Sequence, residues 1–313
     1  MITKNLTILY RTNKTKMIKM TYITINDLSN TIRNNLYKIP HDVDVVVGIP
    51  RSGMIPASII SEYLNVPLID LYSFADGNTD GCGGGRHKTF GKKSRSGKIL
   101  VVDDTVWSGG SKKEAKELLK KYSDMSQFIY MVPYLEGPSY SDIDIFLEDV
   151  RLYTHGFRTC VIYEWNIFNH YVTGNYMFDM DGVLCVDPMD ERKKEEYEKY
   201  IQNAIPLITP TSPIGSIVTY RLEKYRDVTE KWLKDNNIKY KNLVMFDASS
   251  WEDRNSSGIS PAQYKGKIYA NDRIATCFIE SDRVQAEQIH MLTGKPVYCY
   301  SNNILYGNEY KGQ

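Results

Sequence analysis

The sequence predicts an α/β protein made of two doubly wound domains with parallel sheets. Short apolar runs rich in β-branched residues recur along the chain, and several are followed by a turn and a stretch of helical periodicity. The chain has 313 residues, a length at which two domains are the natural expectation. Acidic and hydroxyl side chains gather directly after some of these runs, which is where ligands bind in open α/β sheets.

The bulk composition disfavours several function classes. Lys and Arg number 39 against 38 Asp and Glu, so nothing indicates a nucleic-acid-binding surface or a polybasic membrane anchor. No apolar run approaches the roughly 18 to 20 residues that a transmembrane helix needs. The five cysteines are scattered without a CxxC pair, which favours reduced thiols and a cytoplasmic location. Residues 1–19 are expected to be a disordered or loosely packed leader. The oligomeric state is left open.

The first domain is expected over residues 20–170. Leu28, Ile32 and Leu36 lie at helical spacing after the cap-like residues 26–27, which predicts an amphipathic helix that Pro40 ends. The other elements predicted in this half are strands at residues 43–47, 99–101, 128–132 and 160–163 and helices at residues 54–64 and 115–119.

Residues 102–111 are the most informative stretch of the chain. They read VDDTVWSGGS, so two adjacent carboxylates are followed by a turn rich in hydroxyls and glycines. The backbone N–H groups of such a turn and the following helix N-terminus attract a phosphate. Gly109 and Gly110 let the backbone come close to it. Asp103 and Asp104 can hold ribose hydroxyls, directly or through Mg²⁺.

This stretch resembles the phosphoribosyl-pyrophosphate (PRPP) signature of the type I phosphoribosyltransferases. The resemblance implies that Asp103 and Asp104 are catalytic residues on the ribose hydroxyls and that the turn binds the 5-phosphate. The turn residues implied in binding are Thr105, Val106, Trp107, Ser108, Gly109, Gly110 and Ser111. The alternative is an ordinary strand–turn–helix with acids at a strand end.

A second turn fits the other end of the same donor. Arg51, Ser52 and Gly53 follow the strand predicted at residues 43–47, one strand before the Asp-Asp motif. They match the pyrophosphate loop of the resembled family. We therefore expect them to bind the pyrophosphate of PRPP.

Residues 76–97 are rich in glycine and in cations. This composition is typical of a solvated linker. The resembled family carries a flexible catalytic loop at this point, which favours a lid that closes over the anionic substrate. Arg86, His87 and Lys88 are its best candidate contacts.

A second carboxylate motif follows the apolar strand predicted at residues 176–178. Asp179 and Asp181, two residues apart, belong to a stretch that resembles the first motif of the haloacid-dehalogenase superfamily of phosphatases. The resemblance implies that Asp179 attacks phosphorus and forms an aspartyl-phosphate. It implies that Asp181 protonates the leaving oxygen and then activates water. A DxD at a strand end can also merely bind a metal ion.

Later segments match the remaining motifs of that superfamily in order. Residues 216–219 predict a strand ending in the hydroxyl of Thr219, which would hold the phosphoryl group. Lys265 or Lys267 would neutralise the phosphate; spacing does not decide, and Lys265 is preferred.

Residues 277–282 predict a strand that ends in acids, suited to holding Mg²⁺. The metal ligands that the resemblance implies are Asp179, Asp181, Glu280 and Asp282. Residues 187–213 are either a small cap over the phosphatase pocket or a solvated helical segment.

Together the resemblances imply a bifunctional, Mg²⁺-dependent enzyme of two Rossmann-like domains, with the phosphatase over residues 174–313. The layout is similar to the PRPP-dependent transferase–phosphatase pairs that build ribofuranose into bacterial polysaccharides. The implied acceptor is then a glycan hydroxyl, lipid-linked or free, and the phosphatase leaves plain ribofuranose. The general base for that hydroxyl is open among Asp104, Asp76 and Asp80.

Two other functions stay open at this stage. The acceptor could be a nucleobase, with the second domain acting as a nucleotidase. Trp107 disfavours purine salvage, because an aspartate that handles the purine ring is typical at this position. The first domain could also sense PRPP without catalysis.

Overall fold

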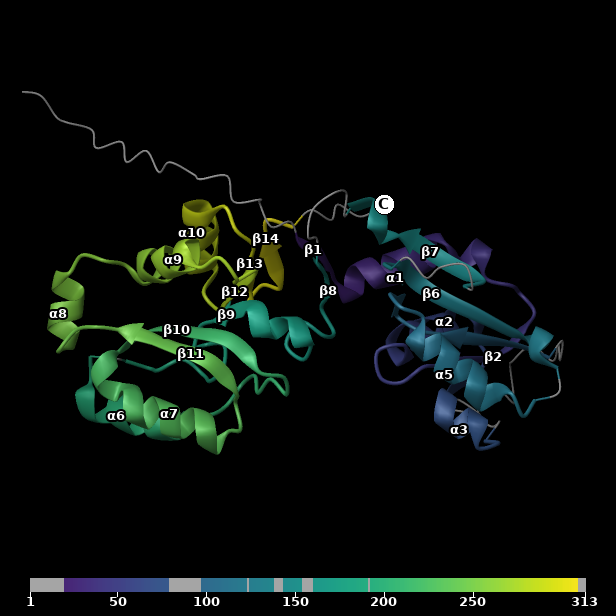
Figure 1. The fold of residues 1–313 in the computed structure, drawn as a ribbon, viewed down its shortest axis with the longest axis horizontal. Helices are drawn as coiled ribbons and strands as arrows, with labels where there is room; N and C mark the ends of the chain where they lie inside the picture. Colours follow the sequence, from purple (N-terminus) through teal and green to yellow (C-terminus); the bar gives the residue numbers. More distant parts are fainter. Residues whose placement is uncertain are drawn as a thin grey trace, which may run out of the picture. The chain divides into compact units, whose positions relative to one another are not determined.

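The computed structural model describes residues 20–78, 97–122, 124–137, 143–153, 160–190 and 192–308. It divides into two compact units (Figure 1). The amino-terminal unit comprises residues 20–173 with 210–212 and residue 308, and the carboxy-terminal unit comprises residues 174–209 and 213–307. The expected leader at residues 1–19 lies outside the described residues. Within the described ranges, no helix combines the length and apolar character needed to cross a membrane.

The amino-terminal unit is built on a parallel sheet. Its strands are β1 (Met20–Ile23), β2 (Val43–Gly48), β3 (Leu68–Asp70), β4 (Lys98–Val102), β5 (Thr105–Val106), β6 (Phe128–Leu135), β7 (Ile145–Asp149) and β8 (Cys160–Tyr163). Its α-helices are α1 (Ile25–Asn34), α2 (Met54–Leu64), α3 (Leu71–Ala75) and α5 (Gly110–Leu119). The main sheet has the order β3-β2-β4-β6-β5, with β7 also paired to β6, and β1 pairs with β8 in a separate sheet. All these pairings are parallel.

Alternating apolar side chains give this sheet two covered faces. Val46 and Leu100 pack in one core with residues of α1 and α2, whereas Val47 and Val101 pack in another with residues of α3 and α5. Successive strand residues point to opposite faces, so continuous β-branched runs are what a sheet covered on both sides requires. The unit therefore has the α/β architecture that the sequence predicts.

The first helix differs from its prediction at both ends. Its cap is Thr24, whose hydroxyl accepts from the Asp27 amide while the Asp27 carboxylate accepts from the Thr24 amide, a capping box. The helix ends at Asn34, before Leu36, because the chain leaves the helical conformation at Asn35 and the Asn35 side chain donates to the Thr31 carbonyl. The prediction of residues 26–27 as the cap and of Leu36 within the helix was wrong.

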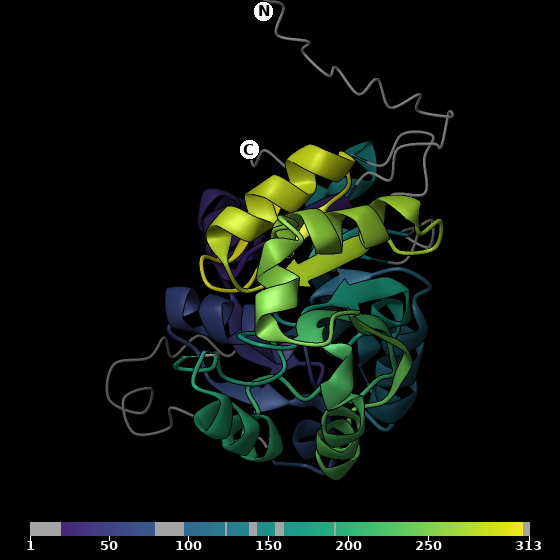
Figure 2. The same ribbon diagram turned by 90° about the vertical axis from the view of Figure 1, so that its left-hand side faces the viewer.

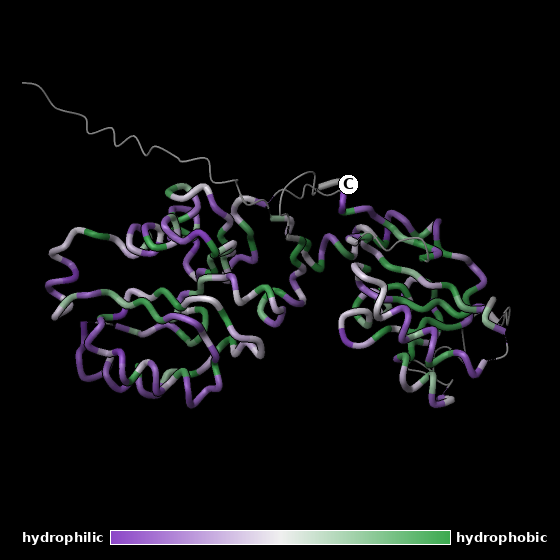
Figure 3. The backbone as a smooth tube through the Cα atoms, in the orientation of Figure 1, coloured by the Kyte–Doolittle hydropathy of each residue, from purple (hydrophilic) through white to green (hydrophobic). Residues whose placement is uncertain are grey.

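The carboxy-terminal unit also has a central sheet. Its strands are β9 (Tyr176–Phe178), β10 (Ile214–Leu222), β11 (Tyr240–Phe246), β12 (Cys277–Glu280), β13 (Val297–Cys299) and β14 (Ile304–Tyr306). Its α-helices are α6 (Lys194–Asn203), α7 (Arg226–Asp235), α8 (Trp251–Ser256), α9 (Pro261–Asn271) and α10 (Arg283–Thr293). Helices α9 and α10 cover one face of the sheet, and α6 and α7 cover the other (Figures 1 and 2). The central strands are mostly hydrophobic, whereas α6 and α7 carry many hydrophilic residues (Figure 3).

This second sheet corrects the prediction of two purely parallel sheets. Its strand order is β11-β10-β9-β12-β13-β14, and the last pair is antiparallel. Only residues 300–303 join β13 to β14, and a connection this short permits a hairpin but no parallel crossover. The sheet is therefore mixed.

Strand β10 corrects a second prediction. It does not end at Thr219 but runs on to Leu222, which pairs with Phe246 of β11 after a shift in register. Leu222 is buried, and this burial favours continuing the strand. Thr219 therefore lies inside the strand rather than at its end.

Candidate active sites

Two loops meet at the carboxyl edge of the amino-terminal sheet. Gly48 of β2 is paired with Val102 of β4, so the turns that follow these strands begin at the same level. The Ile49 amide donates to the Val102 carbonyl at 2.8 Å. A Cβ at Gly53 would stand 2.6 Å from the Ile49 oxygen and 2.7 Å from the Val102 oxygen, so only glycine permits this approach.

The two loops line a cavity of about 380 Å³. Of the residues predicted for the PRPP site, those that line it are Arg51, Ser52, Asp103, Asp104, Thr105, Val106, Trp107, Ser108, Gly109, Gly110 and Ser111. The predicted lid contacts Arg86, His87 and Lys88 lie outside the described residues. The structure thus brings the two turns together around one space, as binding both ends of one donor requires.

The two carboxyl groups of this cavity both have raised pKa values. Burial, followed by the neighbouring Asp104 carboxylate, raises the pKa of Asp103 to about 7. Burial also raises the pKa of Asp104, although the Trp165 indole donates to it at 2.7 Å. Across the described ranges, no lysine or arginine forms an ion pair with either side chain. Buried carboxylates in this state favour a ligand that brings hydroxyl donors or a cation.

The start of α5 lines the cavity. Gly109 is the residue before the helix, with φ of 76°, and among the described residues no side chain caps the first amides. Such amides and the positive end of the helix dipole attract an anion. Ser108 and Ser111 line the cavity at this point and add hydroxyl donors.

The carboxy-terminal unit assembles a second polar centre at the end of β9. Phe178 pairs with Ile217 of β10 and with Ile279 of β12, and the Asp179 amide donates to the Ile279 carbonyl at 2.9 Å. This register sets Asp179 beside Glu280, the next residue of β12.

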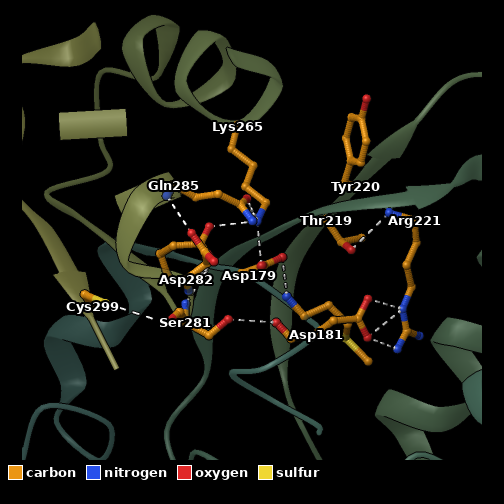
Figure 4. A network of polar contacts seen from close by, with 12 residues as sticks. Asp179, Asp181, Thr219, Tyr220, Arg221, Lys265, Ser281, Asp282, Gln285 and Cys299 are labelled. Carbon is orange, nitrogen blue, oxygen red and sulfur yellow. Dashed lines mark hydrogen bonds and ion pairs between the residues drawn. The ribbon is translucent and has the colours of Figure 1, made fainter. Parts of the chain in front are cut away.

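Lys265 of α9 joins the two carboxylates (Figure 4). Its Nζ lies 2.6 Å from Asp179 Oδ2 and 2.7 Å from Glu280 Oε2. Burial opposes the charge of Lys265, but the two carboxylates outweigh it and raise its pKa above the ordinary value. Burial raises the pKa of Asp179, and the nearby Lys265 opposes that shift. The alternative candidate, Lys267, is exposed on the same helix.

Asp181 has its own cation (Figure 4). Arg221, a buried residue of β10, places its Nε 2.9 Å from Asp181 Oδ2, and the Tyr200 hydroxyl of α6 donates to Asp181 Oδ1 at 2.5 Å. Burial favours a protonated Asp181, but Arg221 outweighs it and lowers the pKa of Asp181 below its ordinary value. Thr219 and Arg221 are two residues apart on β10 and so share a face of the strand.

The predicted group of four metal-binding carboxylates is not assembled. Asp179 and Glu280 share Lys265, and Asp181 is paired with Arg221. Asp282 is exposed and accepts from the Gln285 amide at 2.8 Å as the N-cap of α10. In the part of the chain that the structure describes, no three His, Cys, Asp or Glu side chains form a group suited to a metal ion. Each of these carboxylates instead has a partner within the protein.

Comparison with known proteins identifies the first of these units. Residues 15–144 match the family model of the phosphoribosyl transferase domain. The amino-terminal half carries a phosphoribosyltransferase domain. This match is consistent with the two-loop cavity, which Asp103 and Asp104 line.

Several solved structures are similar to this chain. A purine phosphoribosyltransferase from Pyrococcus horikoshii Ot3 is 17% identical, with a TM-score of 0.33 and coverage of 49% of this chain and 98% of that one. A xanthine-guanine-hypoxanthine phosphoribosyltransferase from Helicobacter pylori is 16% identical, with a TM-score of 0.32 and coverage of 47% and 94%. A chain of the Pnkp1/Rnl/Hen1 complex is 9% identical, with a TM-score of 0.28 and coverage of 92% and 98%.

The phosphoribosyltransferase domain holds two polar residues that the sequence analysis did not single out. Lys112 lines the cavity, is only 8% exposed and lies with its Nζ 4.8 Å from the Tyr130 ring. A lysine in the first turn of a helix opposes the helix dipole, and this signal could have marked it. Glu136 follows β6 and accepts from the hydroxyls of Thr105 and Tyr163, each at 3.3 Å. Burial raises the pKa of Glu136 to about 7.

Proposed function

We propose that this protein transfers the 5-phosphoribosyl group of PRPP to a glycan hydroxyl and then hydrolyses the 5-phosphate from the product. The observation that carries the first step is the cavity that joins the turn at Arg51 with the Asp103–Asp104 motif inside a phosphoribosyltransferase domain. The second step is supported by the Asp179–Lys265–Glu280 arrangement in the other unit.

In the transfer step the donor spans the cavity from one loop to the other. The 5-phosphate binds the turn before α5, and the pyrophosphate extends toward Arg51 and Ser52. When the bond from C1 to the pyrophosphate oxygen breaks, positive charge develops on the ribose, and the carboxylates of Asp103 and Asp104 stabilise it. The carboxylates of Asp103 and Asp104 offer the oxygen ligands that Mg²⁺ prefers, and an ion held there would supply positive charge for the leaving pyrophosphate.

The acceptor oxygen then forms the new bond to C1 and loses its proton. Of the candidate bases, Asp104 lines the cavity, Asp76 does not, and Asp80 lies outside the described residues. A buried carboxyl with a raised pKa is suited to taking up a proton. We therefore assign the base to Asp104.

Trp107 supports a sugar as the acceptor. It lines the cavity with 62% of its surface exposed, so a large indole face borders the space next to the donor. A tryptophan offers a broad amphipathic surface for a ring to pack against, but it has no group that could take a proton from a purine.

In the phosphatase step Asp179 attacks phosphorus as the bond from phosphorus to the sugar oxygen breaks, which gives an aspartyl-phosphate. The sugar oxygen takes its proton from solvent, because Asp181 is ionised. Lys265, which contacts Asp179, balances the charge of the phosphoryl group. Water then attacks phosphorus and releases phosphate. Arg221 keeps Asp181 ionised, and an ionised carboxylate is suited to taking the proton from that water.

The test is a two-product assay. The full chain is incubated with PRPP, Mg²⁺ and either a glycan acceptor or free nucleobases, while pyrophosphate and phosphate are followed. We expect pyrophosphate and then phosphate in the glycan arm only. Pyrophosphate release with a base but no glycan would overturn the acceptor, and binding of PRPP without pyrophosphate release in any arm would favour the sensing function.

A further inference from the structure

A second cavity, of about 240 Å³, lies within the carboxy-terminal unit. It is lined by the first half of α6 and the residue Arg192 before it, by the end of β10 and the turn that follows, and by the start of α8. It is smaller than the roughly 300 to 1,000 Å³ of typical ligand pockets, so its occupant is a small molecule. None of the residues assigned above to phosphate transfer lines it.

The charge of the lining favours an anion. Lys194, Lys224 and Arg254 line the cavity together with the carboxylate of Glu252, and Arg192, which also lines it, is paired with Asp190 at 2.8 Å. Arg254 is buried, and its Nη1 donates to the Tyr220 carbonyl at 2.7 Å, so this guanidinium is held in place. The two lysines are exposed at the cavity and can reach a bound anion.

Aromatic rings form the rest of the wall. Tyr197 is buried, and the edge of the Tyr225 ring meets it at a centroid distance of 5.5 Å. Trp251, the half-buried first residue of α8, lines the same space. Aromatic faces combined with cations bind ligands that carry both a flat ring and a phosphate.

We propose that this cavity binds a nucleoside monophosphate. The base packs against Trp251 and Tyr225, and the phosphate is held by Lys194 and Lys224. A neutral sugar would make no use of the exposed lysines, and a simple anion would make no use of the rings. The proposal goes beyond the transferase and phosphatase activities and does not depend on either.

The cavity also lies close to a residue that contacts Asp181. The Tyr197 ring stacks on Tyr200 at a centroid distance of 5.9 Å, and Tyr200 donates to Asp181. A ligand in the cavity therefore packs against the helix that supplies a partner of Asp181.

The test is calorimetric titration of the full chain in EDTA, which prevents Mg²⁺-dependent turnover, with UMP, AMP, the matching nucleosides and inorganic phosphate as separate probes. We expect one or both monophosphates to bind at least about tenfold more tightly than their nucleoside or phosphate alone. Trp251→Ala and Lys224→Glu should each weaken that binding by about tenfold.

Two controls separate this site from others. Lys231→Glu changes an exposed lysine of α7 that does not line the cavity, and it should bind like the wild type. Asp103→Asn/Asp104→Asn alters the PRPP site and should also leave monophosphate binding unchanged. Equal binding in the Trp251 and Lys224 variants and the wild type would overturn the proposal. So would loss of binding in the Asp103/Asp104 variant. Lys224 is exposed, so its variant keeps the test valid if Trp251→Ala does not fold.

Discussion

In both units a pair of aspartates follows a buried parallel strand, but the two pairs are partnered in opposite ways. Asp103 and Asp104 line an open cavity and, across the described ranges, form no ion pair with a lysine or arginine. Asp179 and Asp181 each contact a buried cation of their own unit. Two aspartate pairs that both follow a parallel strand thus differ in their partners. Within the described ranges, only the pair of the carboxy-terminal unit contacts a lysine or arginine.

The difference matches the two proposed chemistries. A site that stabilises a cationic ribose needs carboxylates that no internal lysine or arginine already pairs. Burial, followed by the Asp104 carboxylate, raises the pKa of Asp103 to about 7, and a bound cation favours its charged form. A site that receives a phosphoryl dianion needs positive charge beside its nucleophile, which Lys265 provides.

The largest expected effect comes from removing the nucleophile of the second unit. Asp179→Asn should lower phosphate release by at least about a thousandfold, because the amide cannot form the aspartyl-phosphate. Pyrophosphate release should continue at the wild-type rate. Asp227→Asn, which changes an exposed aspartate of α7, is the matched control. Intact phosphate release in Asp179→Asn would refute the assignment of Asp179 as the nucleophile.

Lys265 should contribute more to stability than any exposed lysine of the same helix. Lys265→Met leaves Asp179 and Glu280 buried without a cation, which should lower the free energy of unfolding by about 3 to 5 kcal/mol. Lys267 lies two residues further along the helix and is exposed. Lys267→Met should therefore change the free energy of unfolding by less than about 0.5 kcal/mol. Urea denaturation measures both, and equal values for the two variants would contradict the assigned ion pairs.

Glu136 should make the free energy of unfolding fall as pH rises. A salt-bridged acid has the opposite effect, because its contribution to stability grows as pH rises. Its pKa rises from an ordinary value of 4.5 to about 7 in the folded protein, chiefly through burial. Between these values the folded state holds a proton that the unfolded chain has released, so this contribution to stability falls as pH rises from about 4.5 to 7. Glu136→Gln should remove that loss, with a gain over the wild type at pH 8 of up to about 3 kcal/mol that vanishes near pH 4. A gain independent of pH would show that the carboxyl does not titrate as expected.

Replacing Trp107 should weaken the binding of the acceptor and leave the binding of the donor unchanged. Trp107→Ala should raise the KM for the glycan acceptor by about tenfold, the loss of one ring contact, with the KM for PRPP unchanged. Tyr37→Ala, at another exposed aromatic residue of the same unit, serves as the control. A rise in the KM for PRPP instead would assign Trp107 to the donor.

Contiguous elements could be predicted from local signals in the sequence, whereas contacts between distant elements could not. The strand, acidic pair, glycine turn and helix at residues 98–119 are contiguous, so pattern alone places them around one end of β4. The Thr24 capping box is equally local and could have been found.

The partners of the second carboxylate pair could not be predicted in the same way. Arg221 and Tyr200 reach Asp181 from β10 and α6, so their contact depends on tertiary packing rather than on spacing. The sequence favoured Lys265 over Lys267 without deciding between them, because the decision needed the rotation of α9 to be known. The antiparallel β14 follows from a hairpin that the sequence analysis did not consider.

The most direct test of the account is calorimetric titration of PRPP, with Mg²⁺, into the wild-type chain and into Asp103→Asn/Asp104→Asn. The account predicts saturable binding of one PRPP per chain and an affinity at least about tenfold weaker in the double variant. No saturable binding to the folded wild type, or equal affinity in the two proteins, would contradict it.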